Sequence, residues 1–314
     1  MKKVVLFCVV LLLVSSLFVF GAGQKAPAKS GGPIKIGATF HSTYHEFFAE
    51  MIKGMKAEAA AQGVELIISD ENMDVAKQNN TMANFIQMGV NAIILLSVDP
   101  EALNAAALDA MKAGIPVITV DSDVTDPKAF TTFIGSDSYQ MGTMAGTAAG
   151  EYITKEMGGR ATIGIVGWLS HPIAVQRANG FQDALKNVSG ITWAGRQEAD
   201  ARDKALTVAE TMLQGNRNIN LLYGMNEGST LGCLAAVEIQ NKLNQVKVCG
   251  IDISEEVISA IEAGKIPFIV TQQPELMGRV GIQSAIKAMK GETLERRIVI
   301  PAFVVNKANV AKFK

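Results

Sequence analysis

From Ile34 onward, the sequence alternates between short apolar runs rich in β-branched residues and longer segments with apolar residues at helical spacing. The short runs have the length of strands and the longer segments have the length of helices. Several of the longer segments end in glycine, as helices often do; Gly63, Gly89 and Gly114 are examples. Such alternation with short connections predicts parallel strands joined by right-handed crossovers, and so an α/β fold.

The alternation runs once to about residue 135 and then begins again. We expect strands at 34–39, 64–69, 92–97, 114–121, 131–135, 161–166, 191–196, 219–223, 246–251, 268–271, 297–300 and 302–305. We expect helices at 46–62, 75–88, 99–112, 141–156, 175–186, 203–214, 229–241, 255–263 and 274–290. Two successive units of similar size predict two Rossmann-like lobes with parallel sheets, and a ligand would lie between them.

One strand carries the clearest functional signal. Residues 114–123 read Gly-Ile-Pro-Val-Ile-Thr-Val-Asp-Ser-Asp, a continuous β-branched run that ends in acids and a hydroxyl. A strand buried on both faces belongs to a parallel sheet covered by helices. Ligands of such sheets bind beyond the carboxyl ends of the strands, where Asp121 stands. Asp121 either contacts a ligand or caps the following turn.

Composition and charge narrow the class of protein. The chain has 314 residues, of which 48% are hydrophobic and 19% are charged, and these values are typical of a globular protein. Its length allows two domains of ordinary size, each with its own core. The formal net charge of −1 gives no basic field, so we expect no nucleic-acid partner.

The N-terminus has the pattern of a cleavable signal peptide. Two lysines precede an apolar run from Val4 to Phe20, and small residues follow it. We expect cleavage near Ala22, which leaves a soluble exported protein; a retained membrane anchor is the alternative. Residues 23–33 then form a polar tether. In an oxidising compartment, Cys233 and Cys249 can pair or remain buried thiols, and both alternatives stay open.

The sequence lacks the motifs of common catalytic and cofactor sites. No Gly-x-Gly-x-x-Gly follows a strand in the body, and no phosphate-binding loop or Gly-x-Ser-x-Gly turn occurs. The three histidines, His41, His45 and His171, are too scattered to suggest a metal site. We therefore expect no cofactor, no metal and no catalytic residues.

Polar and aromatic residues instead follow several strands. They are His41 to Phe48, Asp121 to Asp123, Tyr223 to Glu227, Asp252, and Gln272 with Gln273. A carboxylate can accept hydrogen bonds from two adjacent hydroxyls, and an amide can both donate and accept. An aromatic ring can cover the apolar side of a sugar. Together, these residue types predict a site for a polyhydroxylated ligand.

From Ile34 to about Val305, the chain resembles the periplasmic sugar-binding proteins of the ribose/galactose (type I) class, which serve ABC transporters. It is also similar to the ligand-sensing half of LacI-type repressors, but a signal sequence precedes it in place of a helix-turn-helix. The motifs that carry the resemblance are Phe47-Phe48, residues 114–121, Ile134-Gly135-Ser136-Asp137 with Gly142, Arg177-Ala178-Asn179-Gly180-Phe181, Tyr223-Gly224-Met225-Asn226, Val248-Cys249-Gly250-Ile251-Asp252 and Gln272-Gln273-Pro274.

The resemblance implies a non-enzymatic solute-binding protein with two lobes and a three-segment hinge. One lobe would hold residues 34–136 and 273–300, and the other residues 137–272 and 301–314. Hydroxyl-binding residues would be Asp121, Asn226, Asp252 and Gln272, and Phe47 and Phe48 would cover the sugar ring. Arg177, Tyr44 and Trp168 complete the expected site. The partners would be a sugar or polyol and an ABC permease, with a monomer in the periplasm.

Several positions depart from the pattern of ribose binders. Val175 stands where they have an arginine clamp, and Ser122 stands where an arginine follows the aspartate. Ala201 replaces a common aromatic, and Tyr44 and His45 stand where an asparagine is common. We therefore expect another pentose, a hexose, a sugar alcohol or a related polyol in place of ribose. A receptor for chemotaxis or sensor-kinase signalling, including furanosyl signals, and a secreted α/β enzyme remain alternatives.

Overall fold

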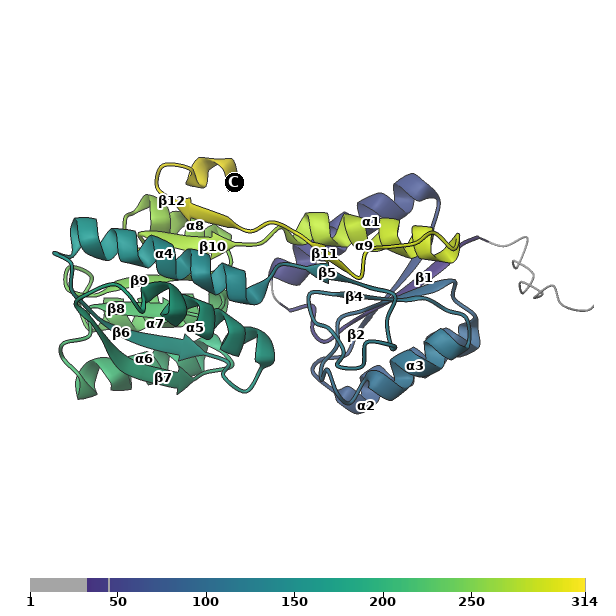
Figure 1. Cartoon of the computed structure of the whole chain (residues 1–314), viewed down its shortest axis with the longest axis horizontal. Coiled ribbons are helices and arrows are strands. Elements are labelled where there is room, and N and C mark those ends of the chain that lie inside the picture. The colour runs from purple at the N-terminus through teal and green to yellow at the C-terminus, as the bar shows by residue number, and fades with distance from the viewer. Residues whose placement is uncertain (1–32, 45, 314) are drawn as a thin grey trace, which may run out of the picture. The chain divides into compact units, whose positions relative to one another are not determined.

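The computed structural model describes residues 33–44 and 46–313, which contain two six-stranded sheets (Figure 1). The predicted signal peptide, nearly all of the tether and His45 lie outside the described residues. The strand order is β11-β5-β4-β3-β1-β2 in the first sheet and β12-β10-β9-β8-β6-β7 in the second. Each sheet with its helices forms one lobe, called the first and the second lobe below.

The first lobe places its helices on both faces of its sheet. Its strands are β1 (Lys35–Phe40), β2 (Glu65–Asp70), β3 (Ala92–Leu95), β4 (Val117–Val120), β5 (Thr132–Gly135) and β11 (Arg297–Val299). Its helices are α1 (Glu46–Gln62), α2 (Val75–Met88), α3 (Asn104–Lys112) and α9 (Pro274–Met289). Ile94 of β3 packs toward α1 and α9, while Ile93 and Leu95 pack toward α2 and α3. The apolar strands are therefore buried on both faces, as their sequence predicts.

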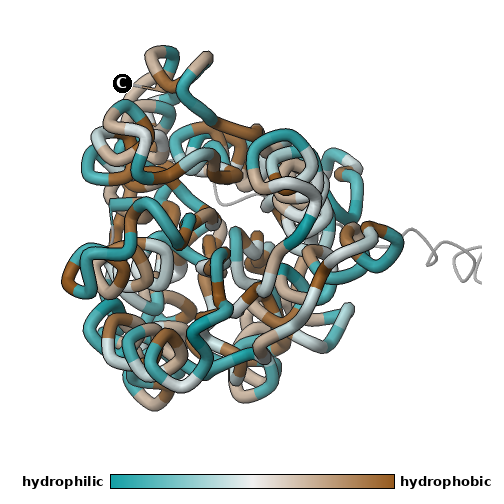
Figure 2. The backbone as a smooth tube through the Cα atoms, turned by 90° about the vertical axis from the view of Figure 1, so that its left-hand side faces the viewer, coloured by the Kyte–Doolittle hydropathy of each residue, from teal (hydrophilic) through white to brown (hydrophobic). Residues whose placement is uncertain are grey.

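The second lobe repeats this plan. Its strands are β6 (Ala161–Gly167), β7 (Ile191–Glu198), β8 (Leu221–Gly224), β9 (Lys247–Ile251), β10 (Phe268–Thr271) and β12 (Phe303–Asn306). Its helices are α4 (Ser138–Glu156), α5 (Pro172–Leu185), α6 (Arg202–Gly215), α7 (Glu227–Ile239), α8 (Glu255–Glu262) and the short 3-10 helix η1 (Val310–Phe313). Helices α4 and α5 cover one face, and α6, α7 and α8 cover the other. Hydrophobic stretches of the backbone run through the interior in Figure 2.

The chain passes between the two sheets three times: from β5 to α4, from β10 to α9, and from β11 to β12. All strand pairs are parallel except β10 with β12, which is antiparallel. The predicted fold class, two α/β lobes with parallel sheets, is confirmed, and the antiparallel β12 is an exception that the alternation pattern does not indicate.

Polar caps move several helix starts away from the predicted positions. Helix α4 begins three residues earlier than predicted because the Asp137 side chain accepts a hydrogen bond from the backbone N–H of Gln140 at 2.9 Å. His171 caps α5 in the same way. Helix α3 begins later than predicted, at Asn104. The Asp99 side chain instead accepts from the backbone N–H groups of Glu101 and Ala102, which form a turn.

In each lobe, one pair of helices is brought into close contact by glycines. A Cβ atom on Gly54 of α1 would lie 2.0 Å from the Glu275 carbonyl oxygen of α9, and one on Gly278 would lie 2.1 Å from the Met51 oxygen. The same reciprocal contact joins α4 and α5. There, a Cβ atom on Gly142 or Gly180 would lie 2.1 Å from a carbonyl oxygen of the facing helix. No larger residue fits these positions without moving a helix.

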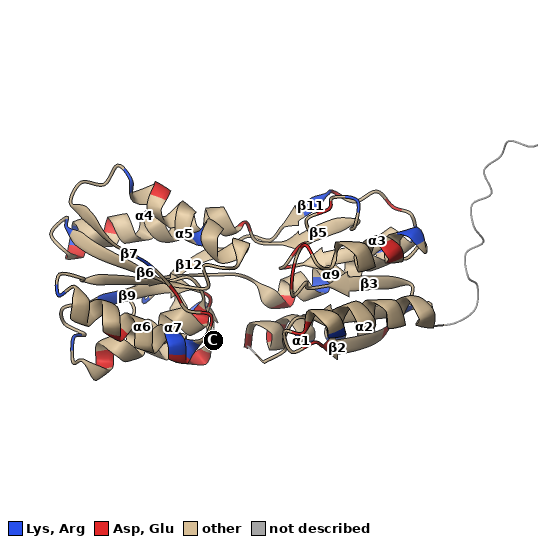
Figure 3. Ribbon diagram, turned by 90° about the horizontal axis from the view of Figure 1, so that it is seen from below, with Lys and Arg blue, Asp and Glu red and all other residues tan. Residues whose placement is uncertain are grey.

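Cys233 and Cys249 are both buried free thiols in this structure. Burial raises the pKa of Cys233 to about 12. Lysines and arginines alternate with aspartates and glutamates over the outer helices of both lobes (Figure 3). Within the described residues, no helix combines the length and apolar character needed to cross a bilayer.

Candidate functional site

Residues of both lobes line one cavity of about 390 Å³. Eight of the nine predicted site residues line it: Phe47, Phe48, Asp121, Trp168, Arg177, Asn226, Asp252 and Gln272. The ninth, Tyr44, is 90% exposed and is not among the lining residues. The site therefore collects residues that lie more than 200 positions apart in the chain at the carboxyl ends of two sheets.

Asp121 follows β4 and lies at the apex of a very tight turn. The Ser122 N–H donates to the Val120 carbonyl at 2.6 Å, and Asp121 between them has a φ of 60°. Left-handed backbone at a residue other than glycine is uncommon and is concentrated at functional sites. The turn presents the Asp121 carboxylate to the cavity, and this carboxylate accepts no hydrogen bond from any described residue.

Asp252 occupies the matching place in the second lobe. It follows β9 and has a φ of 70°, and its N–H donates to Val270 of β10 at 2.7 Å. The N–H of Asp121 likewise donates to Ile134 of β5 at 2.8 Å. Asp252 differs in having side-chain partners, because Gln272 Nε2 donates to its Oδ1 at 2.9 Å and Arg177 lies 3.5 Å from its Oδ2.

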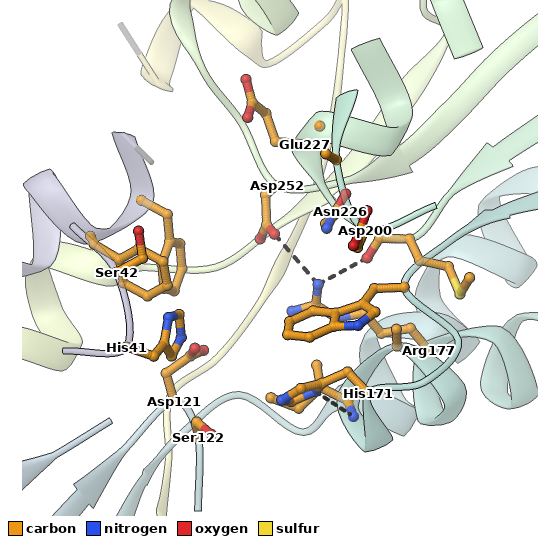
Figure 4. A pocket seen from close by; sticks show the side chains of 18 of the residues that line it. His41, Ser42, Asp121, Ser122, His171, Arg177, Asp200, Asn226, Glu227 and Asp252 are labelled. Carbon is orange, nitrogen blue, oxygen red and sulfur yellow. Dashed lines mark hydrogen bonds and ion pairs between the residues drawn. The ribbon is translucent and has the colours of Figure 1, made fainter. Parts of the chain in front are cut away.

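The electrostatics of the cavity centre on Arg177 between these two aspartates. Its side chain is 7% exposed, and Nη1 donates to the Met225 carbonyl at 2.9 Å and toward Asp252 (Figure 4). Burial raises the pKa of Asp121 to about 6; repulsion from Asp252 adds to this rise, and Arg177 opposes it. Close to pH 6, Asp121 thus changes between a hydrogen-bond donor and a pure acceptor.

Asn226 and Gln272 are partly engaged within the protein. Asn226 caps α7, since its Oδ1 accepts from the Ser229 N–H at 2.8 Å, and its Nδ2 donates to no described residue. Asn226 therefore caps a helix and also lines the cavity, and its contact with a ligand stays a prediction. Gln272 is buried and holds Asp252 in place.

Aromatic rings line the cavity from both lobes. In the first lobe, Phe47 and Phe48 pack edge to face with ring centroids 5.1 Å apart. Phe48 is 7% exposed and belongs to the core, whereas Phe47 is half-buried. In the second lobe, Trp168 packs against His171 at 4.5 Å. The cavity thus combines carboxylates, amides and ring faces, which suit a small ligand with hydroxyls on an apolar frame.

Comparison with known proteins agrees with this geometry. Residues 36–293 match the model of the periplasmic binding protein domain. The chain belongs to this family. It is 29% identical over 312 residues to the ribose import binding protein RbsB of Bacillus subtilis, covering 96% of this chain and 98% of that protein.

Solved structures of the periplasmic binding protein family include close matches to this fold. A solute-binding protein from Mycobacterium smegmatis with bound glycerol is 31% identical, with a TM-score of 0.82 over 90% of this chain and 96% of that one. A solute-binding protein from Bacillus halodurans with bound myo-inositol is 28% identical, with a TM-score of 0.83 over 91% and 98%.

The structure shows where three of the positions that depart from the ribose-binder pattern lie. Ser122 is only 1% exposed, and its hydroxyl donates to the Ser97 carbonyl at 2.9 Å, so it ties β4 to β3. Its side chain is therefore engaged by the protein although it lies at the cavity wall. Ala201 lines the cavity with a methyl group, and Val175 is not among the lining residues.

Several residues that line the cavity are not among the nine predicted site residues, although Glu46 and Glu227 lie in the polar stretches expected after strands. The residues that were not selected include Glu46, Met73, His171, Asp200, Lys204 and Glu227. Glu46 and Glu227 are the first residues of their helices, and the pKa of Glu46 is raised by burial and by repulsion from Glu255 and Glu227. Asp200 pairs with Lys204 at 2.8 Å. His171 follows no strand directly, and only its place before Pro172 could have marked it as a helix cap.

No group of three metal-ligating side chains occurs among the residues that the structure describes.

Proposed function

We propose that this protein captures a sugar or related polyol in the cavity between its lobes and delivers it to an ABC permease. The observation that carries this function is the pair Asp121 and Asp252. Each follows a central strand of its own lobe with a left-handed φ, and both present carboxylate oxygens to one cavity. A ligand with several hydroxyls can donate to both carboxylates at once.

Ligand capture would involve closure of the two lobes. We place the hinge at the three crossings of the chain, near 136–137, 272–273 and 300–301, with residues 34–136 and 273–300 in one lobe. A ligand that contacts Asp121 and Asp252 together binds the closed arrangement better than an open one, so it shifts the population toward closure. Gln272 lies at one crossing and hydrogen-bonds to Asp252, which links hinge and site.

Family membership supports the remaining parts of the proposal. The relatives include proteins named as import binding proteins and as ABC transporter solute-binding proteins. We infer a monomer that is exported to the periplasm and docks on a membrane permease. The solved relatives carry glycerol and myo-inositol, so polyols belong in any ligand search beside ribose.

A thermal-shift screen of the purified mature protein tests this function. The panel contains D-ribose, D-allose, D-arabinose, D-tagatose, myo-inositol and glycerol, each at 1 mM. A ligand at 100 times its Kd stabilises a protein by about 2.7 kcal/mol, which raises the Tm by roughly 5–10 °C at this chain length. A flat response across the panel, extended to hexoses and sugar alcohols, would contradict the proposal.

The same sample distinguishes a binding protein from an enzyme. The bound compound is released by denaturation after a day at 25 °C and examined by mass spectrometry and NMR. We expect it to be recovered unchanged, because none of the residues around Asp121 is arranged as a nucleophile with its base. Conversion of the compound would favour a secreted α/β enzyme.

A further inference from the structure

His171 is a cavity residue whose two ring nitrogens differ in their surroundings. It precedes Pro172 at the start of α5, and its Nδ1 accepts a hydrogen bond from the Ile173 N–H at 3.3 Å. The ring is half-buried and lines the cavity (Figure 4), and its Nε2 has no hydrogen-bond partner among the described residues. Nδ1 thus caps helix α5, and Nε2 lies on the cavity side of the ring.

The surroundings of His171 determine the tautomer and the charge of its ring. Because Nδ1 is an acceptor, a neutral ring carries its hydrogen on Nε2. Burial lowers the pKa of His171, and the positive charge of Arg177 lowers it further, while Asp99 of the first lobe opposes this. At pH 7 the ring is therefore neutral, and Nε2–H is a defined donor.

Packing against Trp168 fixes the direction of this donor. The two ring centroids lie 4.5 Å apart at an interplanar angle of 39°. Together with the bond to Ile173, this contact limits rotation of the imidazole. A donor held in place before the ligand arrives costs less entropy to use than a mobile one.

His171 adds a neutral donor to a cavity that is rich in acceptors. Asp121, Asp252 and Glu227 offer acceptors, which suit hydroxyl hydrogens. A sugar ring or ether oxygen can only accept. Nη1 of Arg177 is engaged with the Met225 carbonyl and Asp252, so the donors of this part of the cavity are the other N–H groups of Arg177, Asn226 Nδ2 and His171 Nε2–H. A neutral N–H near the wall matches an oxygen of this kind without adding charge.

We propose that His171 is a ligand-contacting residue that donates a hydrogen bond from Nε2–H to an oxygen of the bound sugar or polyol. This inference rests on the proposed function, since it concerns the same cavity. A purely structural role, in which His171 only caps α5, is the alternative that the test must separate.

Two substitutions separate the cap from the donor. His171→Ser keeps a side-chain acceptor for the α5 N-terminus but cannot reach the ligand space. His171→Gln loses the cap and keeps an amide N–H near the position of Nε2. We expect His171→Ser to weaken binding about tenfold with the Tm unchanged. We expect His171→Gln to keep binding within about threefold while the Tm falls.

A cap outside the cavity provides the control. Asp74 caps α2 by accepting from the Lys77 N–H at 2.9 Å and does not line the cavity. Asp74→Ala should lower the Tm and leave affinity unchanged. Affinity is measured by calorimetry at pH 7.5 with the panel compound that gives the largest thermal shift. Wild-type affinity in His171→Ser would overturn the inference.

The tautomer of His171 gives a second readout that needs no ligand. Long-range ¹H–¹⁵N spectra of the wild type at pH 7.5 should show a protonated Nε2 and an unprotonated Nδ1, with Nε2 shifting when ligand is added. A proton on Nδ1 would overturn the inference even if sugars bind. A wild type that binds no panel compound would count against the proposed function instead, which keeps the two failures distinct.

Discussion

The two lobes share one plan but differ at the aspartates that line the cavity. Each sheet has the same strand arrangement, each has one helix pair brought together by reciprocal glycines, and each presents an aspartate at positive φ after a central strand. Asp252 is held by Gln272 and Arg177. The carboxylate of Asp121 has no hydrogen-bond donor among the described residues, and its pKa is raised to about 6.

This difference suggests a division of roles. Asp252 is organised in the absence of ligand, because its partners come from its own lobe and from the crossing at Gln272. Asp121 bears a cost of burial that only the charge of Arg177 offsets, until a ligand supplies hydrogen-bond donors. Asp252 is therefore held in position before a ligand arrives, whereas Asp121 gains hydrogen bonds only when a ligand binds.

We expect the largest loss of ligand affinity on substitution of Asp252. Asp252→Ala deletes a ligand acceptor and leaves Arg177 buried with the Met225 carbonyl as its remaining bonded partner. We expect ligand affinity to fall at least 100-fold and unfolding free energy to fall by about 3 kcal/mol. Calorimetry and urea unfolding measure the two losses.

The exposed pair of Asp109 with Lys112 gives a matched control for this prediction. Asp109→Ala should change stability by less than about 0.5 kcal/mol and leave affinity alone. Wild-type ligand affinity in Asp252→Ala would contradict the proposal that Asp252 contacts the ligand.

Asp121→Asn should have the opposite effect on stability. Folded Asp121 holds its proton up to about pH 6, whereas an ordinary aspartate releases it near 3.8. Stability is thus lost as pH rises between these values, by up to about 3 kcal/mol for a shift of this size. Ligand-free Asp121→Asn should exceed the wild type by about 1–3 kcal/mol at pH 8 and equal it near pH 3.5.

Urea unfolding at the two pH values measures this gain, and Asp252→Asn provides the comparison. That variant should be less stable than the wild type at pH 8, because it weakens the contact with Arg177. Equal changes in stability for Asp121→Asn and Asp252→Asn would contradict the proposed difference between the two aspartates.

The glycine contacts test the similarity of the lobes. Gly54→Ala in the first lobe and Gly180→Ala in the second should each destabilise by about 1–3 kcal/mol, because a Cβ atom meets a backbone carbonyl oxygen. Gly215→Ala at the end of α6 is the control, since its Cβ would have no neighbour within 4 Å. Thermal unfolding of the three variants should separate the first two from the third.

The smallest effect is expected at Ser122. Ser122→Ala removes the hydrogen bond to Ser97 and should cost about 1 kcal/mol of stability. Ligand affinity should stay within about threefold of the wild type, because the hydroxyl is engaged within the protein. A tenfold change in affinity would indicate that Ser122 contacts the ligand.

Much of the fold was predictable because burial on both faces leaves a continuous apolar signal in the strands. The helices at 46–62 and 75–88 were predicted to the residue. The starts of α4 and α5 were missed because a cap depends on one side-chain hydrogen bond, such as that of Asp137. The direction of β12 depends on contacts with β10 that its own sequence does not encode locally.

The site was less predictable than the fold. Residues that follow strands, such as Asp121 and Asp252, were found because topology brings strand ends together. His171 lies at a helix start, where a polar residue has an ordinary capping role, so its place in the cavity emerges only in three dimensions. Glu227 lies in a stretch that was expected near the site, but its position at the start of α7 gave no reason to select it within that stretch. The hydrogen bond of the Ser122 hydroxyl to the Ser97 carbonyl was not predictable either, because it joins residues 25 positions apart.

The pKa of the Asp121 carboxyl shows whether a bound ligand supplies the hydrogen-bond donors that this residue lacks. It is measured by ¹³C NMR of the wild type between pH 3 and 9, with and without saturating ligand. We expect a pKa of about 6 without ligand and a fall of at least one unit with ligand, because ligand hydroxyls donate to the ionised form. An unchanged value in the ligand complex would contradict the claim that Asp121 is completed by the ligand.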